Sequence, residues 1–194
     1  MASYSVEVGG GVKVQTTVVK TASMVDTFVG ELKNLCAGNT KPIIGLDLEW
    51  NSNSADPKVA ILQLCVGTRC LIIQLRYLNV VPASLKNLIS DPAVSFVGVG
   101  VTEDVAKLLK DYGIECKNAI ELGPLAARVY GKTTEYAKKG LADLALEVVG
   151  FHMEKHPNVS CSNWDNETLT NEQIKYATID AYASYLIGKK LLIG

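Results

Sequence analysis

The chain contains 194 residues, of which 48% are hydrophobic and 20% are charged. This length is enough for one sizeable core and too short for two comfortable domains, so we expect a single domain over residues 1–194. The 19 Lys and Arg residues nearly balance the 20 Asp and Glu residues, which leaves a formal net charge of −1. The balance gives no bulk positive field that would indicate nucleic acid, and no acidic excess that would indicate disorder.

Apolar runs in the chain are too short for a membrane span. The run Val59–Val66 is about half as long as the ~20 residues that a span needs. The start, Met1–Glu7, has neither the basic and apolar pattern of a secretory signal nor the Arg- and Ser-rich pattern of an organelle address. We therefore expect an intracellular protein, in the nucleus or the cytoplasm, with no signal peptide or transmembrane segment.

Residues 1–20 predict a β-hairpin, because apolar and polar residues alternate on both sides of the turn Gly9–Gly11. We expect this hairpin to extend the sheet as an antiparallel edge, where a second copy of the chain could pair to form a homo-oligomer. From Thr21, apolar residues recur at helical spacing and stop at Gly38. This spacing predicts a helix with one buried face.

Three β-type runs follow and predict a meander: Pro42–Trp50, Val59–Val66 and Cys70–Leu75. After a short helical stretch at Leu85–Ile89, the run Ala93–Val101 predicts another strand. A helix is expected next at Thr102–Tyr112, with Thr102 as its N-cap.

The rest of the chain is predicted to be helical, apart from a polar loop from His152 to Leu169. The expected helices are Leu122–Val129, Leu141–Val149 and Asn171–Leu192. A meander that passes into strand–helix units predicts an α/β fold, with a mixed β-sheet flanked by helices. Residues 42–192 form the expected core and carry the motifs described next.

Asp47 and Glu49 interrupt the most apolar of the predicted strands. Strand alternation places both carboxylates on one face and the neighbouring apolar residues on the other. Two buried carboxylates oppose each other's ionisation, and a divalent cation would neutralise them. The alternative is a strand end that emerges into solvent, where acidic residues are ordinary.

Two further candidate positions lie on predicted helices. Asp104 falls in the first turn after a strand, where sites of α/β folds collect, although the helix dipole also favours an acid there. Tyr176 and Asp180 are four residues apart on the last helix and so share one face, which is either part of a site or solvated. If the three segments converge, their oxygens would form a site for two Mg²⁺ or Mn²⁺ ions about 3.5–4 Å apart, which suits in-line attack on phosphodiesters.

The order and spacing of these motifs resemble the three exonuclease motifs of the DEDD superfamily, in its tyrosine-bearing branch with the ribonuclease-H-like fold. The match is Asp47-x-Glu49, then Asp104 in a Gly-Val-Gly-Val-x-x-x-Asp context, then Tyr176-x-x-x-Asp180. It is similar to the Werner-syndrome-type exonuclease domain over about three quarters of the chain, including the segment Cys161–Trp164.

This resemblance implies a metal-dependent 3′–5′ exonuclease that releases nucleoside monophosphates from single-stranded or 3′-ended DNA or RNA. It implies that Asp47 bridges two ions and that Glu49 and Asp180 hold the ion on the nucleophile side. Asp104 would support the second ion through water, and Tyr176 would orient the attacking water.

Other interpretations of the sequence stay open. Trp50 could stack on the terminal base, or it could belong to the core because it alternates with Leu46 and Leu48. The near-neutral charge also permits a weakly active or inactive module that binds nucleic acid or protein and retains the exonuclease fold.

Overall fold

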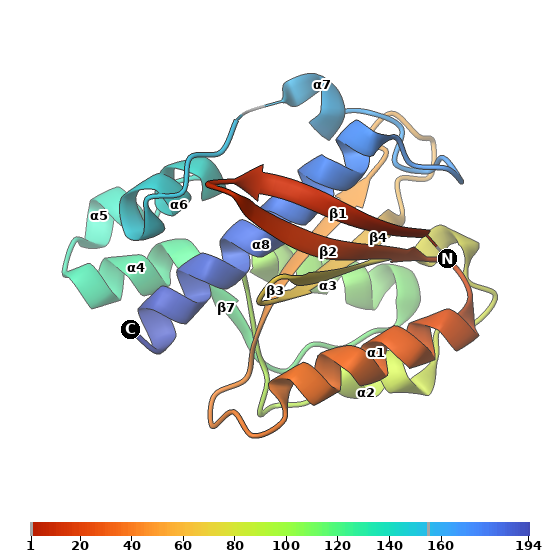
Figure 1. Cartoon of the computed structure of the whole chain (residues 1–194), viewed down its shortest axis with the longest axis horizontal. Coiled ribbons are helices and arrows are strands. Elements are labelled where there is room, and N and C mark those ends of the chain that lie inside the picture. Colours follow the sequence, from red (N-terminus) through yellow and green to blue (C-terminus); the bar gives the residue numbers. More distant parts are fainter. Residues whose placement is uncertain (1, 155) are drawn as a thin grey trace.

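The computed structural model describes residues 2–154 and 156–194. Its centre is a seven-stranded sheet in the order β1-β2-β5-β4-β3-β6-β7 (Figure 1). The strands are β1 (Ala2–Gly9), β2 (Val12–Val19), β3 (Ile43–Trp50), β4 (Val59–Val66), β5 (Arg69–Gln74), β6 (Ser95–Gly98) and β7 (Ala119–Glu121). The α-helices are α1 (Ala22–Cys36), α2 (Ala83–Ile89), α3 (Val101–Tyr112), α4 (Leu122–Tyr130), α5 (Thr133–Tyr136), α6 (Leu141–Val149), α7 (Pro157–Ser160) and α8 (Asn171–Leu192).

The sheet is mixed, as the sequence predicts, but the N-terminal hairpin joins it differently. Strands β3, β4 and β5 form the expected antiparallel meander, and β6 and β7 extend it in parallel beyond β3. β1 and β2 pair as the predicted antiparallel hairpin, whereas β2 runs parallel to β5. The antiparallel edge expected from the hairpin is therefore present in β1, whereas the parallel join of β2 to β5 is not predicted by the sequence. The crossover through α1 makes β2 parallel to β3, and two antiparallel steps make β5 parallel to β3 as well.

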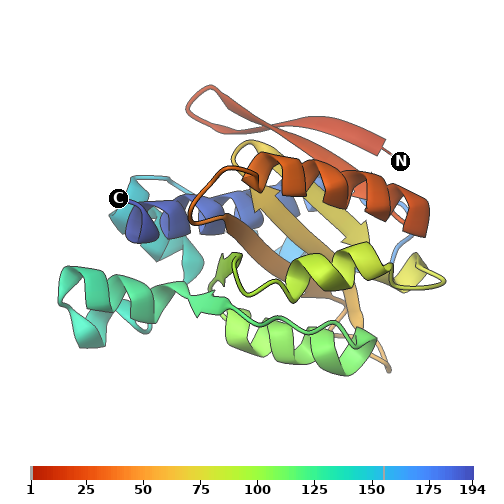
Figure 2. The same ribbon diagram turned by 90° about the horizontal axis from the view of Figure 1, so that it is seen from below.

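Helices cover both faces of the sheet (Figure 2). On one face, α1, α2 and α3 pack against apolar side chains of β3, β4 and β5. On the other face, the first half of α8 packs against β1, β2, β4 and β5, and its second half packs with α4 and α6. β1 is the outer edge of the sheet. The homo-oligomer expected at that edge stays a prediction.

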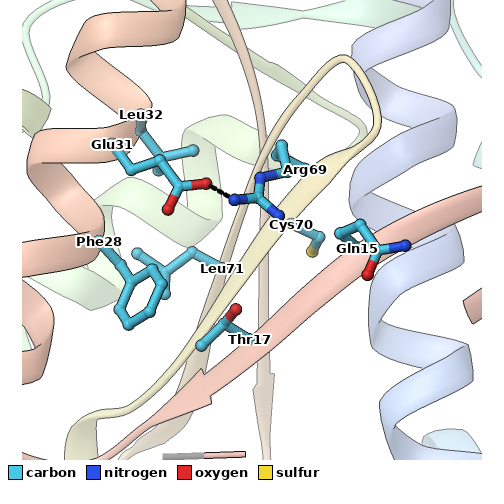
Figure 3. A pocket seen from close by; sticks show the side chains of 8 residues that line it. All are labelled: Gln15, Thr17, Phe28, Glu31, Leu32, Arg69, Cys70 and Leu71. Carbon is cyan, nitrogen blue, oxygen red and sulfur yellow. Dashed lines mark ion pairs between the residues drawn. The ribbon is translucent and has the colours of Figure 1, made fainter. Parts of the chain in front are cut away.

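Helix α1 shows how the periodic pattern becomes a layer. Thr21 is its N-cap, and the side-chain oxygen accepts a hydrogen bond from the Met24 N–H at 3.4 Å. Figure 3 shows Phe28 and Leu32 directed toward the strands, beside an ion pair between Glu31 and Arg69. The apolar side of α1 is thus buried, and Glu31 on its polar side contacts Arg69 of β5.

The junction between β6 and α3 differs from the sequence prediction. β6 ends at Gly98 and α3 begins at Val101, so the strand is shorter than the run Ala93–Val101. The N-cap is Gly100, with φ +73°, and not Thr102. Glycine adopts this left-handed backbone without the strain that a side chain would add.

Some elements cannot be predicted from the sequence, because they have too few residues to show the repeat of apolar positions that marks a helix or a strand. β7 has three residues, and α5 and α7 have four each. None of the helices in the described part of the chain combines the length and the apolar character that a membrane crossing requires.

Helix α8 lies directly on β3, and a glycine makes this contact possible. A Cβ atom at Gly45 would lie 2.2 Å from the carbonyl oxygen of Ala181 and 2.8 Å from the backbone nitrogen of Tyr185. These atoms belong to backbone, which cannot rotate away. The contact brings the middle of α8 against the strand that carries Asp47 and Glu49.

We expect Gly45→Ala to lower the free energy of unfolding by about 3 kcal/mol or more, because the added methyl group forces α8 away from β3. Urea unfolding monitored by circular dichroism measures this change. Gly30→Ala is the matched control, since nothing lies within 4 Å of its added Cβ in helix α1. This control should raise stability by about 0.4–1 kcal/mol. Equal effects at the two positions would contradict the role of the α8–β3 contact.

Candidate active site

The acidic site is built between β3 and α8. Asp47 and Glu49 follow Gly45 at two-residue steps, so all three point to the face that α8 covers. Asp180 immediately precedes Ala181, the residue of α8 that touches Gly45. As a result, Asp47, Glu49 and Asp180 each place a carboxylate oxygen within 4.8 Å of the other two.

Asp47 is at the centre of this group. Its Oδ1 accepts a hydrogen bond from the Leu48 N–H at 2.9 Å, and its Oδ2 lies 3.5 Å from Nε2 of Gln63. Burial raises the pKa of Asp47 to about 6, and the hydrogen bond from Leu48 and an interaction with Asp180 oppose the increase. Burial and the charge of Asp47 raise the pKa of Asp180 well above its usual range. Without a cation, ionisation of one of these carboxyl groups therefore makes ionisation of the other less favourable.

Glu49 experiences the same conflict. Burial, followed by the charges of Asp47 and Asp180, raises the pKa of this carboxyl group far above its usual value. Only a hydrogen bond with Gln63 acts in the opposite direction. Three carboxylates held this close are stable as ions only beside positive charge.

Asp104 approaches the group from α3 without belonging to the three-residue cluster. It is buried in the first turn of the helix. Burial, then the charges of Asp47, Glu121 and Glu103, raises its pKa to about 8. The influence of Asp47 places Asp104 on the margin of the acidic site.

Glu121 holds the beginning of α3 in place. Its Oε1 accepts a hydrogen bond from the Thr102 N–H at 2.7 Å, and its Oε2 accepts one from the Gly100 N–H at 3.0 Å. This carboxylate, 21 residues away in sequence, satisfies the helix N-terminus in place of the expected Thr102 cap. Glu121 thereby fixes the turn from which Asp104 projects.

Tyr176 lies one helical turn before Asp180 and is half-buried. Burial and the charge of Asp180 raise the pKa of its hydroxyl group, so the phenol stays neutral at physiological pH. Its ring packs at 6.0 Å, centroid to centroid, from that of Trp164, and its hydroxyl group hydrogen-bonds with Ser160. A neutral hydroxyl beside carboxylates can donate to one oxygen and accept from another.

Trp50 follows Glu49 but faces away from the acidic cluster. It is partly buried and packs against the core on the α1–α3 side of the sheet. The ammonium nitrogen of Lys107 lies 5.2 Å from the centre of its ring, and 3.3 Å from Oδ2 of Asp111. Packing accounts for much of the Trp50 side chain, which agrees with the core alternative considered for it.

A cavity of about 760 Å³ adjoins the site. One wall is the face of α8 that carries Tyr176 and Asp180, and another is the hairpin turn around Gly9 and Gly10. The chain between α6 and α7 adds Phe151 and Met153. A volume of this size accommodates a small molecule or a nucleotide.

Two functional candidates were missed from the sequence, Gln63 and Glu121. Gln63 contacts Asp47 from β4, and Glu121 contacts the turn that carries Asp104 from the end of β7. The signal for Gln63 was its position as the polar residue inside the apolar run Val59–Val66, and it pairs directly with Asp47 in the sheet. Glu121 had no local signal, because its partners come from the beginning of α3.

The donor set fits a hard divalent cation. Carboxylate oxygens are preferred by Mg²⁺ and Mn²⁺, whereas the cluster contains no thiolate or imidazole that would favour zinc. The closely spaced oxygens belong to Asp47, Glu49 and Asp180. Asp104 adds another acidic side chain from helix α3.

Comparison with known proteins finds the relatives of this chain among exonucleases. The family model described as a 3′–5′ exonuclease matches residues 17–192. The chain is 32% identical over 153 residues to the mouse bifunctional 3′–5′ exonuclease/ATP-dependent helicase WRN, covering 77% of this chain and 11% of that protein. It is 34% identical over 159 residues to human exonuclease 3′–5′ domain-containing protein 2, covering 78% of this chain and 25% of that protein.

Solved structures agree with the fold. The EXD2 exonuclease domain soaked in Mn and GMP is 31% identical with a TM-score of 0.55, over 91% of this chain and 89% of that chain. RNase D of Escherichia coli, an exoribonuclease, has a TM-score of 0.76 at 22% identity, over 92% of this chain and 44% of that chain. These neighbours confirm the predicted ribonuclease-H-like α/β fold. The chain spans a quarter or less of the two curated relatives named above.

We expect the metal-free protein to lose stability as the pH rises from about 4 to about 8. The raised pKa values mean that the folded state binds protons more tightly than the unfolded state in this range, so deprotonation favours unfolding. Thermal unfolding in EDTA at pH 5 and pH 8 measures the effect. Mg²⁺ or Mn²⁺ added at pH 8 should raise the melting temperature, because the ion binds the folded state.

The variant Asp104→Asn serves as the control for this pH dependence. It removes one of the buried charges, so the melting temperature in EDTA should depend less steeply on pH than in the wild type. A metal-free wild-type protein that becomes more stable between pH 5 and pH 8 would contradict the assignment of a strained acidic cluster.

Proposed function

Because the chain belongs to the 3′–5′ exonuclease family, we propose that it removes nucleotides one at a time from the free 3′ end of DNA or RNA, using divalent metal ions. The observation that carries this proposal is the cluster of Asp47, Glu49 and Asp180 between β3 and α8. The cluster has the oxygen donors and the unrelieved negative charge that Mg²⁺ or Mn²⁺ would neutralise.

The residues have distinct roles in this proposal. Asp47, at the centre, would hold the metal together with Glu49 and Asp180. Asp104 would support it through water, in agreement with its place outside the close group of oxygens. When bound, the ions would lower the pKa of water and offset the charge that develops on the phosphoryl group and the leaving oxygen.

Tyr176 orients the attacking water in this proposal. Its hydroxyl group stays neutral and lies on the same helix face as Asp180, one turn away. It can accept a hydrogen bond from water or donate one to a phosphate oxygen. The adjoining cavity, which both residues line, provides space for the terminal nucleotide.

The proposal is tested with DNA and RNA oligonucleotides that carry a label at the 5′ end and a free 3′ hydroxyl. With Mg²⁺ or Mn²⁺ the protein should produce a ladder that shortens from the 3′ end, and EDTA should stop the reaction. Asp47→Asn should lower the rate by about 10³-fold or more, since it removes the central ligand of the metal site.

Asp143→Asn is the matched control, because Asp143 is exposed on α6 and lies outside the acidic cluster. It should degrade the oligonucleotides at the wild-type rate. Intact oligonucleotides with both ions would contradict the proposal, and binding without degradation that is unaffected by EDTA would favour an inactive binding module. Activity that survives EDTA would exclude the metal-dependent mechanism.

Trp50 is only partly buried, and we also propose that its exposed part contributes to substrate binding at the end of β3, although the ring faces away from the acidic cluster. Trp50→Leu keeps an apolar side chain against the core but removes the aromatic ring. We expect KM for a single-stranded oligonucleotide to rise about 10-fold with kcat little changed, because stacking on a base is worth about 1–3 kcal/mol. An unchanged KM would assign Trp50 to the core alone.

A further inference from the structure

Gln63 is a fully buried polar residue in a strand whose other residues are all buried as well. It pairs directly with Asp47 in the antiparallel register of β3 and β4. Directly paired residues project to the same face of a sheet, so the Gln63 amide lies beside the acidic cluster. We propose that Gln63 is a positioning residue that holds the carboxylates of Asp47 and Glu49 in the orientation needed to bind metal; this inference rests on the proposed function.

One amide group reaches both carboxylates. Nε2 of Gln63 lies 3.5 Å from Oδ2 of Asp47, and the same side chain opposes the rise in the pKa of Glu49. The NH₂ group has two protons, enough for both carboxylates. A carboxylate that binds a cation through one oxygen keeps other lone pairs free, and a donor at those positions fixes the rotation of the carboxylate.

The other end of the amide shows that this arrangement is not optimal for stability. Oε1 of Gln63 is buried and has no hydrogen-bond partner in the described residues. An unpartnered carbonyl oxygen in a core is unfavourable, and an apolar side chain of the same length would avoid it. Ionised carboxylates only accept hydrogen bonds, so the NH₂ group must face them and the oxygen must face the core.

Gln74 provides the contrast within the same sheet. It is also buried, in the neighbouring strand β5, and its Nε2 donates to the carbonyl oxygens of Asn166 and Glu167 at 3.3 and 2.9 Å. These bonds attach the turn before α8 to the sheet. Gln74 therefore has a structural role with no contact to the carboxylates, and it is a matched control for Gln63.

The experiment compares Gln63→Met and Gln74→Met with the wild type. Mn²⁺ affinity is measured by isothermal titration calorimetry without nucleic acid, and stability by urea unfolding in EDTA. Gln63→Met should weaken Mn²⁺ binding by about 10–100-fold, the usual effect of removing a group that orients metal ligands. Its unfolding midpoint in EDTA should be equal to or higher than that of the wild type, because the unpartnered Oε1 is gone.

Gln74→Met should show the opposite pattern, with a lower unfolding midpoint and wild-type Mn²⁺ affinity. Wild-type Mn²⁺ affinity in Gln63→Met would overturn the inference. It would also be overturned if Gln63→Met lowered the unfolding midpoint as much as Gln74→Met, which would show a structural role alone.

A measurement on the wild type covers the case in which Gln63→Met does not fold. In NMR spectra, the side-chain amide signals of Gln63 should shift when Mg²⁺ is added and those of Gln74 should not. Unchanged Gln63 signals, with shifts at the backbone amide of Leu48, would overturn the inference. If the wild type and Gln63→Met bind Mn²⁺ and degrade oligonucleotides equally well, only the role of Gln63 is refuted. If the wild type binds no Mn²⁺, the proposed function is refuted too.

Discussion

Helix α8 and strand β3 approach so closely that a side chain at position 45 would overlap helix backbone. The rest of the site depends on this contact. With the two backbones nearly touching, the first side chains beyond Gly45 have little choice of position, and Asp47 must meet Asp180. The same packing that builds the core on that face therefore forces like charges together. Neither element could form the acidic cluster alone, since each supplies only part of the carboxylates.

The sheet can accommodate this repulsion between carboxylates because its two faces differ in polarity. The face toward α1, α2 and α3 is largely apolar and supplies most of its burial from aliphatic side chains, with Thr17 of β2 as a buried polar residue. The face toward α8 contains buried Thr16 and Gln63, and Thr16 shares a hydrogen bond at 2.9 Å with Thr178 of the helix. Stability is concentrated on one side, so the other can keep groups that are unfavourable until a cation or a substrate arrives.

Local sequence patterns predict those features of the structure that depend on residues close together in the chain. Alternation in β3 places Asp47 and Glu49 on one face, and the four-residue spacing in α8 places Tyr176 beside Asp180. Interactions between distant segments decide the rest. The N-cap assigned to Thr102 fails because Glu121 arrives from β7, a strand of three residues without a recognisable period. The parallel pairing of β2 with β5 depends on the route of α1 and not on the hairpin sequence.

The hairpin turn around Gly9 and Gly10 lines the same cavity as Tyr176 and Asp180, yet it precedes the residues 17–192 that match the exonuclease family. The acidic cluster and one wall of the adjoining cavity thus come from separate stretches of the chain. Substitutions in the turn can reshape that space while every acidic residue keeps its place. The shape of this space can therefore change separately from the acidic cluster, and the hairpin is the first segment to compare between relatives that differ in substrate.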